Sequence, residues 1–134
     1  VFDLLAALLE WNDLTLSTPT TASISAKDQE AMQSLKHFLL QNYSTKVDLQ
    51  RLAQMCYMSK SKLTYLFRML YGTTIYEFVL ACRIDRAKEL LADQEKKISE
   101  IATLVGYERQ SSFSAAFHQR TGITPNEFRR QLDN

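Results

Sequence analysis

The sequence predicts an all-α protein in which two helix-turn-helix subdomains are joined by a long central helix. A first indication is the pattern Phe-x4-Gly-x4-Glu-Phe, which begins at Phe67 and recurs fifty positions later at Phe117. A second is the composition of the 134 residues: 46% are hydrophobic, 23% are charged, and only three Gly and two Pro interrupt the chain. The apolar residues also recur at helical spacing, and no segment alternates with the period of a strand. A packed helical protein is therefore expected, and a disordered one is excluded.

The chain is expected to divide into three regions. Residues 1–12 form an apolar segment of helical pattern that is expected to pack on a partner outside the printed sequence. Residues 13–26, which are rich in Ser and Thr, are typical of a linker. The duplicated region occupies 27–134, and it divides into a first subdomain at 27–73, a connecting helix at 74–93 and a second subdomain at 94–134.

Three helices are predicted in the first subdomain. Apolar residues at helical spacing predict the first of them over 27–41. Asp48 and Ser59 are suited to cap the other two, because their side chains can accept hydrogen bonds from free backbone amides of a first turn. The last helix is expected to end at Gly72, since a glycine readily adopts the left-handed conformation of a helix stop. A tight connection at 56–58 separates these two helices and completes a helix-turn-helix.

The connecting helix is predicted over 74–92, where Thr74 and Glu77 can form a capping box. At 1.5 Å per residue, such a helix is a rigid spacer of about 27 Å. The second subdomain repeats the order of the first, and its helices are predicted at 98–105, 110–120 and 125–132. Each of the first two ends at a glycine, and the third opens with a second capping box formed by Thr124 and Glu127.

The third helix of the first subdomain has one apolar and one polar face. The apolar face is formed by residues at i, i+3, i+4 and i+7 and must point into the core: Leu63, Leu66, Phe67 and Leu70. The opposite face carries donors, acceptors and positive charge: Ser61, Lys62, Thr64, Tyr65 and Arg68. Such a mixture suits the base edges and phosphates of a nucleic acid. For Tyr65 the alternative is that its ring covers the edge of the core.

The corresponding helix of the second subdomain has fewer long polar side chains. The same periodicity directs Phe113, Ala116 and Phe117 inward. The outer face and its flanks carry small or uncharged residues and one histidine: Gln110, Ser111, Ser112, Ser114, Ala115 and His118. Because the central Ala115 offers only a methyl contact, this helix is expected to read fewer bases than the first.

The charge of the chain permits nucleic-acid binding without requiring it. Residues 27–134 hold sixteen basic and twelve acidic residues, which gives a net charge of +4. The pI of 7.9 lies below the value of about 9 that is typical of strongly basic nucleic-acid-binding domains. For each basic residue, a solvated helix face is the alternative to a binding role. Arg83 and Arg86 are left outside the site, because pairing with neighbours such as Asp85 and Glu89 is equally expected.

Several function classes are excluded by what the sequence lacks. No apolar run approaches the roughly 18 residues of a membrane span and no signal peptide appears, so a cytoplasmic location is expected. Cys56 and Cys82 lack the spacing of a zinc site or a disulfide framework, and neither a metal nor a cofactor is expected. Ser111, Ser112 and His118 lie close in sequence, but no strand, nucleophile elbow or phosphate-binding loop accompanies them. We therefore expect that the protein is not an enzyme.

A specific spacing of aromatic residues, glycines and a proline runs through the second subdomain: Gly106, Tyr107, Phe113, Phe117, Gly122, Pro125, Phe128 and Arg129. With these residues, the region 27–132 resembles the DNA-binding region of the AraC/XylS family of bacterial transcription regulators. The resemblance implies base-reading positions in both recognition helices: Ser61, Lys62, Thr64 and Tyr65 in the first, and Gln110, Ser111, Ser114 and Ala115 in the second. Family members often have Arg where this chain has Ala115, and a Ser or Thr cap where it has Lys97.

The resemblance also implies the partners. Candidate phosphate contacts are the basic residues on or beside the recognition helices: Lys60, Arg68, Arg109, His118 and Arg120. Double-stranded DNA is the expected ligand, with the recognition helices in successive major grooves and RNA polymerase as the target of promoter activation. Residues 1–12 are then the C-terminal helix of a sensor or dimerisation domain, and a homodimer is expected through the region before residue 27. The alternative is a helical protein-interaction module without DNA binding, which would lack a steep salt dependence of duplex binding.

Overall fold

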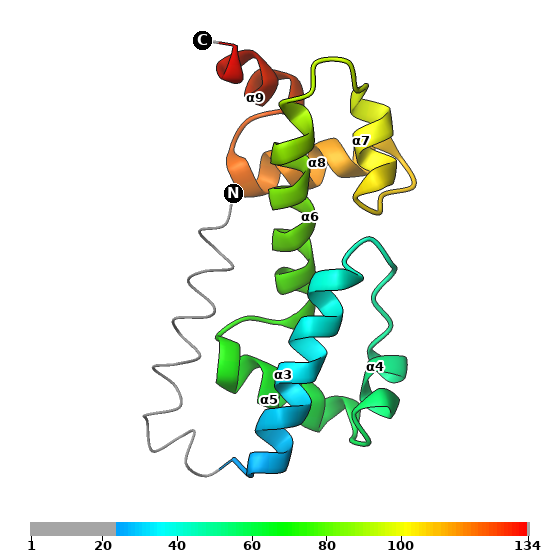
Figure 1. The fold of residues 1–134 in the computed structure, drawn as a ribbon, viewed down its shortest axis with the longest axis vertical. Coiled ribbons are helices and arrows are strands. Elements are labelled where there is room, and N and C mark those ends of the chain that lie inside the picture. The colour runs from blue at the N-terminus through cyan, green and yellow to red at the C-terminus, as the bar shows by residue number, and fades with distance from the viewer. Residues whose placement is uncertain (1–23, 134) are drawn as a thin grey trace. The chain divides into compact units, whose positions relative to one another are not determined.

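The computed structural model describes residues 24–133, and within that range the chain is helical and contains no strand (Figure 1). The helices are α3 (Ala26–Gln41), α4 (Leu49–Met55), α5 (Lys60–Tyr71), α6 (Ile75–Leu91), α7 (Ile98–Leu104), α8 (Gln110–Thr121) and α9 (Pro125–Leu132). The all-α class predicted from the sequence is confirmed. The predicted helix at 1–12 and the predicted linker as far as residue 23 lie outside the described residues. Every helix from α3 to α9 is too short or too polar to span a bilayer.

The described residues pack into two compact units whose segments alternate along the chain. The first unit contains α3, α4 and α5, together with the start of α6 as far as Val79. The second unit contains α6 from Leu80 onwards, with α7, α8 and α9, and it also takes in the loop Tyr43–Lys46. The long helix that the sequence predicts as a connector therefore contributes residues to both units.

Both predicted recognition helices, α5 and α8, end where the sequence predicts. The hydroxyl of Ser59 caps α5 by accepting the backbone N–H of Lys62 at 3.1 Å. Gly72 ends α5 with a φ of 71°, and Gly122 ends α8 with a φ of 85°. In this left-handed conformation each glycine donates its N–H to a carbonyl of the last helical turn. The two helices consequently have the same length and the same kind of C-terminus.

One helix start differs from its prediction. The Thr74 hydroxyl accepts the backbone N–H of Glu77 at 3.1 Å, as expected of a cap at the start of α6. The Glu77 carboxylate, however, accepts the Thr74 hydroxyl at 3.0 Å and not the Thr74 backbone N–H. The capping box predicted there is thus only half formed, whereas the box at Thr124 and Glu127 has both of its bonds.

The core of the first unit forms where the apolar face of α5 meets its neighbours. The residues predicted to point inward are all buried: Leu63, Leu66, Phe67 and Leu70. The Phe67 ring packs edge-on against Tyr71, with ring centroids 4.9 Å apart, and against Phe78 at 5.7 Å. Such edge-to-face pairs add stability beyond the area that they bury. With the apolar side of α5 held in this way, its polar side is left facing outward.

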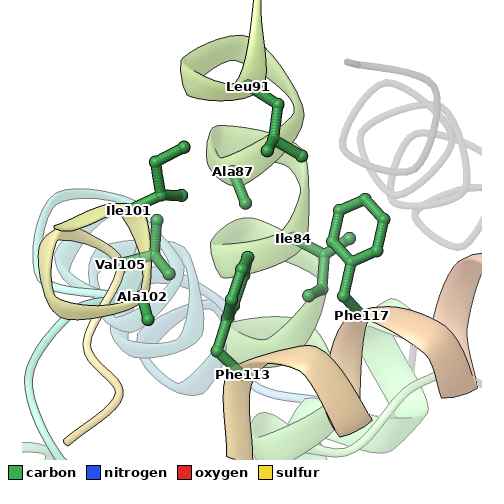
Figure 2. Packing of buried hydrophobic residues seen from close by; sticks show 8 residues of the cluster. All are labelled: Ile84, Ala87, Leu91, Ile101, Ala102, Val105, Phe113 and Phe117. Carbon is green, nitrogen blue, oxygen red and sulfur yellow. The ribbon is translucent and has the colours of Figure 1, made fainter. Parts of the chain in front are cut away.

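The core of the second unit is a single cluster from α6, α7 and α8 (Figure 2). Its members are Ile84, Ala87, Leu91, Ile101, Ala102, Val105, Phe113 and Phe117. Figure 2 shows Phe113 and Phe117 pointing from α8 towards α6. The Phe117 ring also packs against that of Phe128 in α9, with centroids 5.6 Å apart. The aromatic residues of the duplicated pattern are therefore core residues that orient α8.

The turn before each recognition helix has the same hydrogen-bonded form. After α4, the N–H of Met58 donates to Ala53 O at 3.0 Å, and after α7 the N–H of Tyr107 donates to Ala102 O at 2.9 Å. This six-residue closure is the Schellman motif, which requires a left-handed residue just after the helix. Gly106 fills that position in the second unit with a φ of 106°, whereas in the first unit Tyr57 does so with a φ of 57°.

Two arginines fasten irregular segments of the second unit. Arg83 donates from Nε to Tyr43 O at 2.7 Å and from Nη2 to Thr45 O at 3.1 Å. Its guanidinium also lies over the Tyr107 ring, 5.0 Å from the centroid. Arg129 repeats this forked arrangement at the C-terminal end of α6, where it donates to the carbonyls of Leu91 and Asp93. The guanidinium fork suits this task, because its donors have a fixed geometry.

The two arginines of α6 have different partners. Arg86 pairs with Glu89 in the same helix at 2.7 Å, which is one of the pairings considered from the sequence. Arg83 instead binds the backbone of the loop Tyr43–Lys46, about forty residues away in the chain. Its role in the second unit is therefore structural.

Candidate nucleic-acid interface

The outer face of α5 contains the predicted polar residues of the first recognition helix. Ser61, Lys62, Thr64 and Tyr65 are all exposed, and 60% of the Tyr65 surface is accessible. Most of the Tyr65 side chain is therefore open to solvent, and Tyr65 is not a buried core residue. Because the buried residues hold the other side of α5, this face presents hydroxyl, phenol and ammonium groups to solvent together. These are groups that can bind base edges and phosphate oxygens.

Lys62 lies at the edge of this face, where it meets α3. Its Nζ lies 3.3 Å from Oδ2 of Asp28, and 51% of the lysine side chain remains exposed. An ion pair that is this open to solvent contributes little to stability, because water screens it. The ammonium group can therefore exchange Asp28 for another acceptor, such as a phosphate oxygen or a base carbonyl, at small cost.

The two predicted phosphate contacts of α5 lie at its ends. Lys60 is the first residue of the helix and Arg68 is in its last turn, and both are exposed. Positive side chains at both ends, with a polar face between them, match a helix that spans a groove between two phosphate backbones.

The outer face of α8 is also exposed but has different chemistry. Gln110, Ser111 and Ala115 are exposed, whereas Ser114 is only half-buried because it lies beside the core. The predicted phosphate contacts Arg109, His118 and Arg120 are exposed as well. All the predicted site residues of α8 thus reach the surface, although Ser114 reaches it least.

The start of α8 is open to a ligand. Its N-cap is Arg109, which makes no side-chain capping hydrogen bond, because a guanidinium has no acceptor. The N–H groups of the first turn are therefore left without a side-chain partner, and the helix dipole concentrates partial positive charge there. Such a terminus, reinforced by the arginine, favours a phosphate oxygen.

The sequence reasoning missed two exposed residues. Gln119 lies one helical turn beyond Ala115 and is exposed on the same face of α8. Its i+4 spacing from Ala115 is the signal that could have identified it. Tyr57, in the turn between α4 and α5, is 95% exposed and has a positive φ, which is unusual for a residue with a side chain. No spacing rule identifies such a backbone conformation.

A groove of about 630 Å³ borders the first recognition helix. One wall follows α3, and the other is the turn between α4 and α5, with Lys62 at its edge. Three exposed apolar side chains line it: Phe38, Met55 and Tyr57. The first unit therefore combines a polar face on α5 with an adjoining groove whose lining is partly apolar.

Cys82 is buried and Cys56 is half-buried, and the pKa of each thiol lies above its ordinary value. Burial, and to a lesser extent the charge of Asp85, raises the pKa of Cys82 to about 12, so this thiol stays protonated. Burial also raises the pKa of Cys56. Among residues 24–133, no three His, Cys, Asp or Glu side chains are grouped so that they could hold a metal ion. The exposed groups of α5 and α8 are suited to binding.

Residues 52–131 match a protein-family model described as a helix-turn-helix domain. The matched range begins in α4 and ends in α9, so it includes both turns and both recognition helices. The chain belongs to the AraC-type helix-turn-helix family. The resemblance inferred from the aromatic and glycine spacing is confirmed.

The chain is also similar to curated transcription regulators. The chain is 31% identical over 119 residues to a probable transcriptional regulator, LumQ, of Photobacterium leiognathi. This match covers 85% of this chain and 48% of LumQ. It is 37% identical over 84 residues to the transcriptional activator RhaR of Cronobacter sakazakii, covering 63% of this chain and 30% of RhaR. The chain thus spans about half or less of the length of these relatives.

Solved structures of the AraC type show the same fold. The C-terminal domain of AraT, a response regulator from Geobacillus stearothermophilus, has a TM-score of 0.69 at 29% identity. That match covers 81% of this chain and 88% of the solved C-terminal domain. The C-terminal domain of the response regulator yesN from Fusobacterium nucleatum has a TM-score of 0.70 at 28% identity, covering 75% and 98% of the two chains.

Proposed function

We propose that this chain is the sequence-specific double-stranded DNA-binding region of a bacterial transcription regulator. The observation that carries the proposal is the repeated geometry of two recognition helices. Each follows a Schellman turn, each is fixed by buried aromatic or aliphatic residues, and each exposes its opposite face. A helix-turn-helix binds DNA by placing that face in the major groove.

In the proposed complex, phosphate contacts set the register and side chains on the outer faces read the bases. Lys60, Arg68, Arg109, His118 and Arg120 are the phosphate contacts. Ser61, Lys62, Thr64 and Tyr65 read bases from α5, and Gln110, Ser111, Ser114 and Ala115 do so from α8. The two helices enter successive major grooves, which are about 34 Å apart on straight duplex DNA. If the spacing of the two helices differs from that of the grooves, the DNA bends to bring both grooves onto the helices.

The first test measures duplex binding at increasing salt. If the four Lys and Arg phosphate contacts all form, the logarithm of the binding constant should fall against the logarithm of salt concentration with a slope of about −3.6. Lys60→Ala should reduce that slope by about 1 and weaken all sequences alike. Lys96→Ala, on neither recognition helix, is the matched control and should leave the slope unchanged. A flat salt dependence would instead favour the protein-interaction module without DNA binding.

The proposal for the whole protein extends beyond the described residues. Residues 1–12 would be the last helix of a sensor or dimerisation domain, residues 13–26 a linker, and 27–134 the DNA-binding region. The protein would act in the cytoplasm without enzymatic activity, form a homodimer through the region before residue 27, and activate promoters by contacting RNA polymerase. Names of relatives such as RhaR, a transcriptional activator, support this proposal. Transcription in vitro from a selected binding site, with and without the protein, tests it.

A further inference from the structure

The two recognition helices can be compared position by position, because both are twelve residues long and both end at a left-handed glycine. Lys60 opens α5 and Gln110 opens α8, so equivalent residues differ by fifty in number. The outer face then pairs Lys62 with Ser112, Tyr65 with Ala115 and Met69 with Gln119. At the first two of these positions α8 replaces a long side chain by a short one.

The outer face of α8 contains no Lys or Arg between its ends. Ser111, Ser112 and Ala115 are exposed there, and the next turn adds the exposed amide of Gln119. The arginines of α8 lie outside this stretch, at Arg109 and Arg120. The side chains at Ser112 and Ala115 are consequently short, and the middle of the face is uncharged and partly apolar. The α8 backbone can therefore approach base edges more closely than the α5 backbone, from which Tyr65 projects.

The composition of this face limits which base pairs it can recognise. Bidentate recognition of guanine in the major groove uses Arg or Lys, which the middle of α8 lacks. A methyl group such as that of Ala115 contacts the thymine methyl, and a Gln amide pairs with the N6 and N7 edge of adenine. Residues at i and i+4 have Cβ atoms about 5–6 Å apart, which places Ala115 and Gln119 within reach of neighbouring base pairs.

We propose that α8 selects A·T base pairs, with the Ala115 methyl packed on a thymine methyl and the Gln119 amide paired with an adenine edge. This inference rests on the proposed DNA-binding function and names the sequence class that its second helix prefers. The specificity comes from the short side chain of Ala115, whose equivalent in α5 is the long Tyr65. The half of the operator that α8 contacts is then A·T-rich, whereas the half that α5 contacts has no such restriction.

The first experiment selects bound duplexes from a random pool with the parent chain and with Gln119→Ala. The positions at which Gln119→Ala loses preference mark the half-site of α8, and A·T pairs should predominate there. Gln131→Ala, an exposed glutamine of α9, is the matched control and should retain the parent preference at every position. A G·C preference at the positions affected by Gln119→Ala would overturn the inference while leaving DNA binding intact.

The second experiment removes the thymine methyl by replacing thymine with uracil in that half-site. The parent chain should bind the uracil duplex about fourfold more weakly at the contacted position, as expected for the loss of one buried methyl group. Ala115→Gly should bind the thymine and uracil duplexes equally well. Because each protein is compared with itself on two duplexes, any weakening of α8 by glycine cancels from the ratio.

The outcomes separate this inference from the function on which it depends. If no duplex is bound in a salt-dependent manner, the DNA-binding proposal itself fails. If duplexes are bound but uracil substitution has no effect on the parent chain, the thymine contact of Ala115 is refuted. If Ala115→Gly keeps the full thymine preference, another residue makes the contact and the assignment to Ala115 is wrong.

Discussion

Gly106 lies directly against the backbone of Ser44, so closely that a Cβ atom on Gly106 would come within 2.5 Å of the Ser44 carbonyl oxygen. The glycine has a φ of 106°, and it forms the left-handed corner of the second helix-turn-helix. The loop Tyr43–Lys46 is packed into the second unit at this point and is held there by Arg83. One residue thus meets two requirements, a turn conformation and a close backbone contact.

Gly106→Ala should lower the free energy of unfolding by about 2–4 kcal/mol, because the alanine is strained at that φ and also collides with backbone atoms. The matched control is Gly122→Ala, where φ is 85° but no atom lies within 4 Å of the new Cβ. This second variant should lose only about 1 kcal/mol, from backbone strain alone. Urea unfolding of both variants provides the measurement. Equal losses would show that the contact with Ser44 is unimportant.

Arg83→Ala should destabilise the protein by about 1.5–3 kcal/mol, since it leaves two carbonyls of the loop Tyr43–Lys46 without their charged donor. Arg86→Ala is the control, because Arg86 pairs only with the partly exposed Glu89 and should cost less than about 1 kcal/mol. Thermal or urea unfolding measures the loss of stability in each variant. Limited proteolysis should also cut the loop Tyr43–Lys46 faster in Arg83→Ala. An unchanged cleavage rate would contradict the proposal that Arg83 holds this loop in place.

Tyr65→Ala should cost about 1–3 kcal/mol of binding free energy on a selected site and relax the preference at one or two base pairs. Arg68→Ala should instead weaken cognate and random duplexes alike, because a phosphate contact carries no sequence information. Tyr76→Ala, which removes a tyrosine of similar exposure from α6, should leave binding unchanged. Equal losses on cognate and random DNA for Tyr65→Ala would refute its role as a base reader.

Phe117→Ala should cost roughly 3–5 kcal/mol, because the ring is fully buried between α6, α8 and α9. Hydrogen exchange should show the second unit opening before the first, since the cavity lies in the second core. Phe38→Ala is the control, because Phe38 is 36% exposed and belongs to the first unit, so it should cost less than Phe117→Ala and should not open the second unit. A melting curve like that of the parent would show that Phe117 does not contribute to the core.

The pKa of Glu127 should lie below its ordinary value of 4.5, because hydrogen bonds from the backbone and side chain of Thr124 stabilise the carboxylate. A carboxyl group with a lowered folded pKa stabilises the protein above its ordinary pKa, and that contribution disappears as pH falls through the lowered value. Thr124→Ala should therefore raise the Glu127 pKa, as measured by NMR titration. Because alanine keeps the backbone N–H that donates to Glu127, an unchanged pKa in the variant would show that the Thr124 hydroxyl does not contribute to the shift.

Much of the local structure could be predicted because it depends on neighbours in sequence. Ser59 and Gly72 bound α5 as expected, since a cap acts on amides or carbonyls within one turn. The exposed position of Tyr65 also follows from the helical period, once Leu63 and Phe67 are placed in the core. The predicted capping box at Thr74 was only half right, because either donor of that threonine can reach the Glu77 carboxylate.

The order of helices, both recognition faces and the AraC-type resemblance were determined by the sequence alone, because each depends on spacing along the chain. Only the tertiary structure decided which distant groups meet: Lys62 with Asp28, Arg83 with the Tyr43 and Thr45 carbonyls, and Gly106 with Ser44. An arginine is chemically suited to any nearby acceptor, so sequence could not choose between Asp85 or Glu89 and a loop about forty residues away. That choice depends on helix packing, which brings the loop within reach of the guanidinium group.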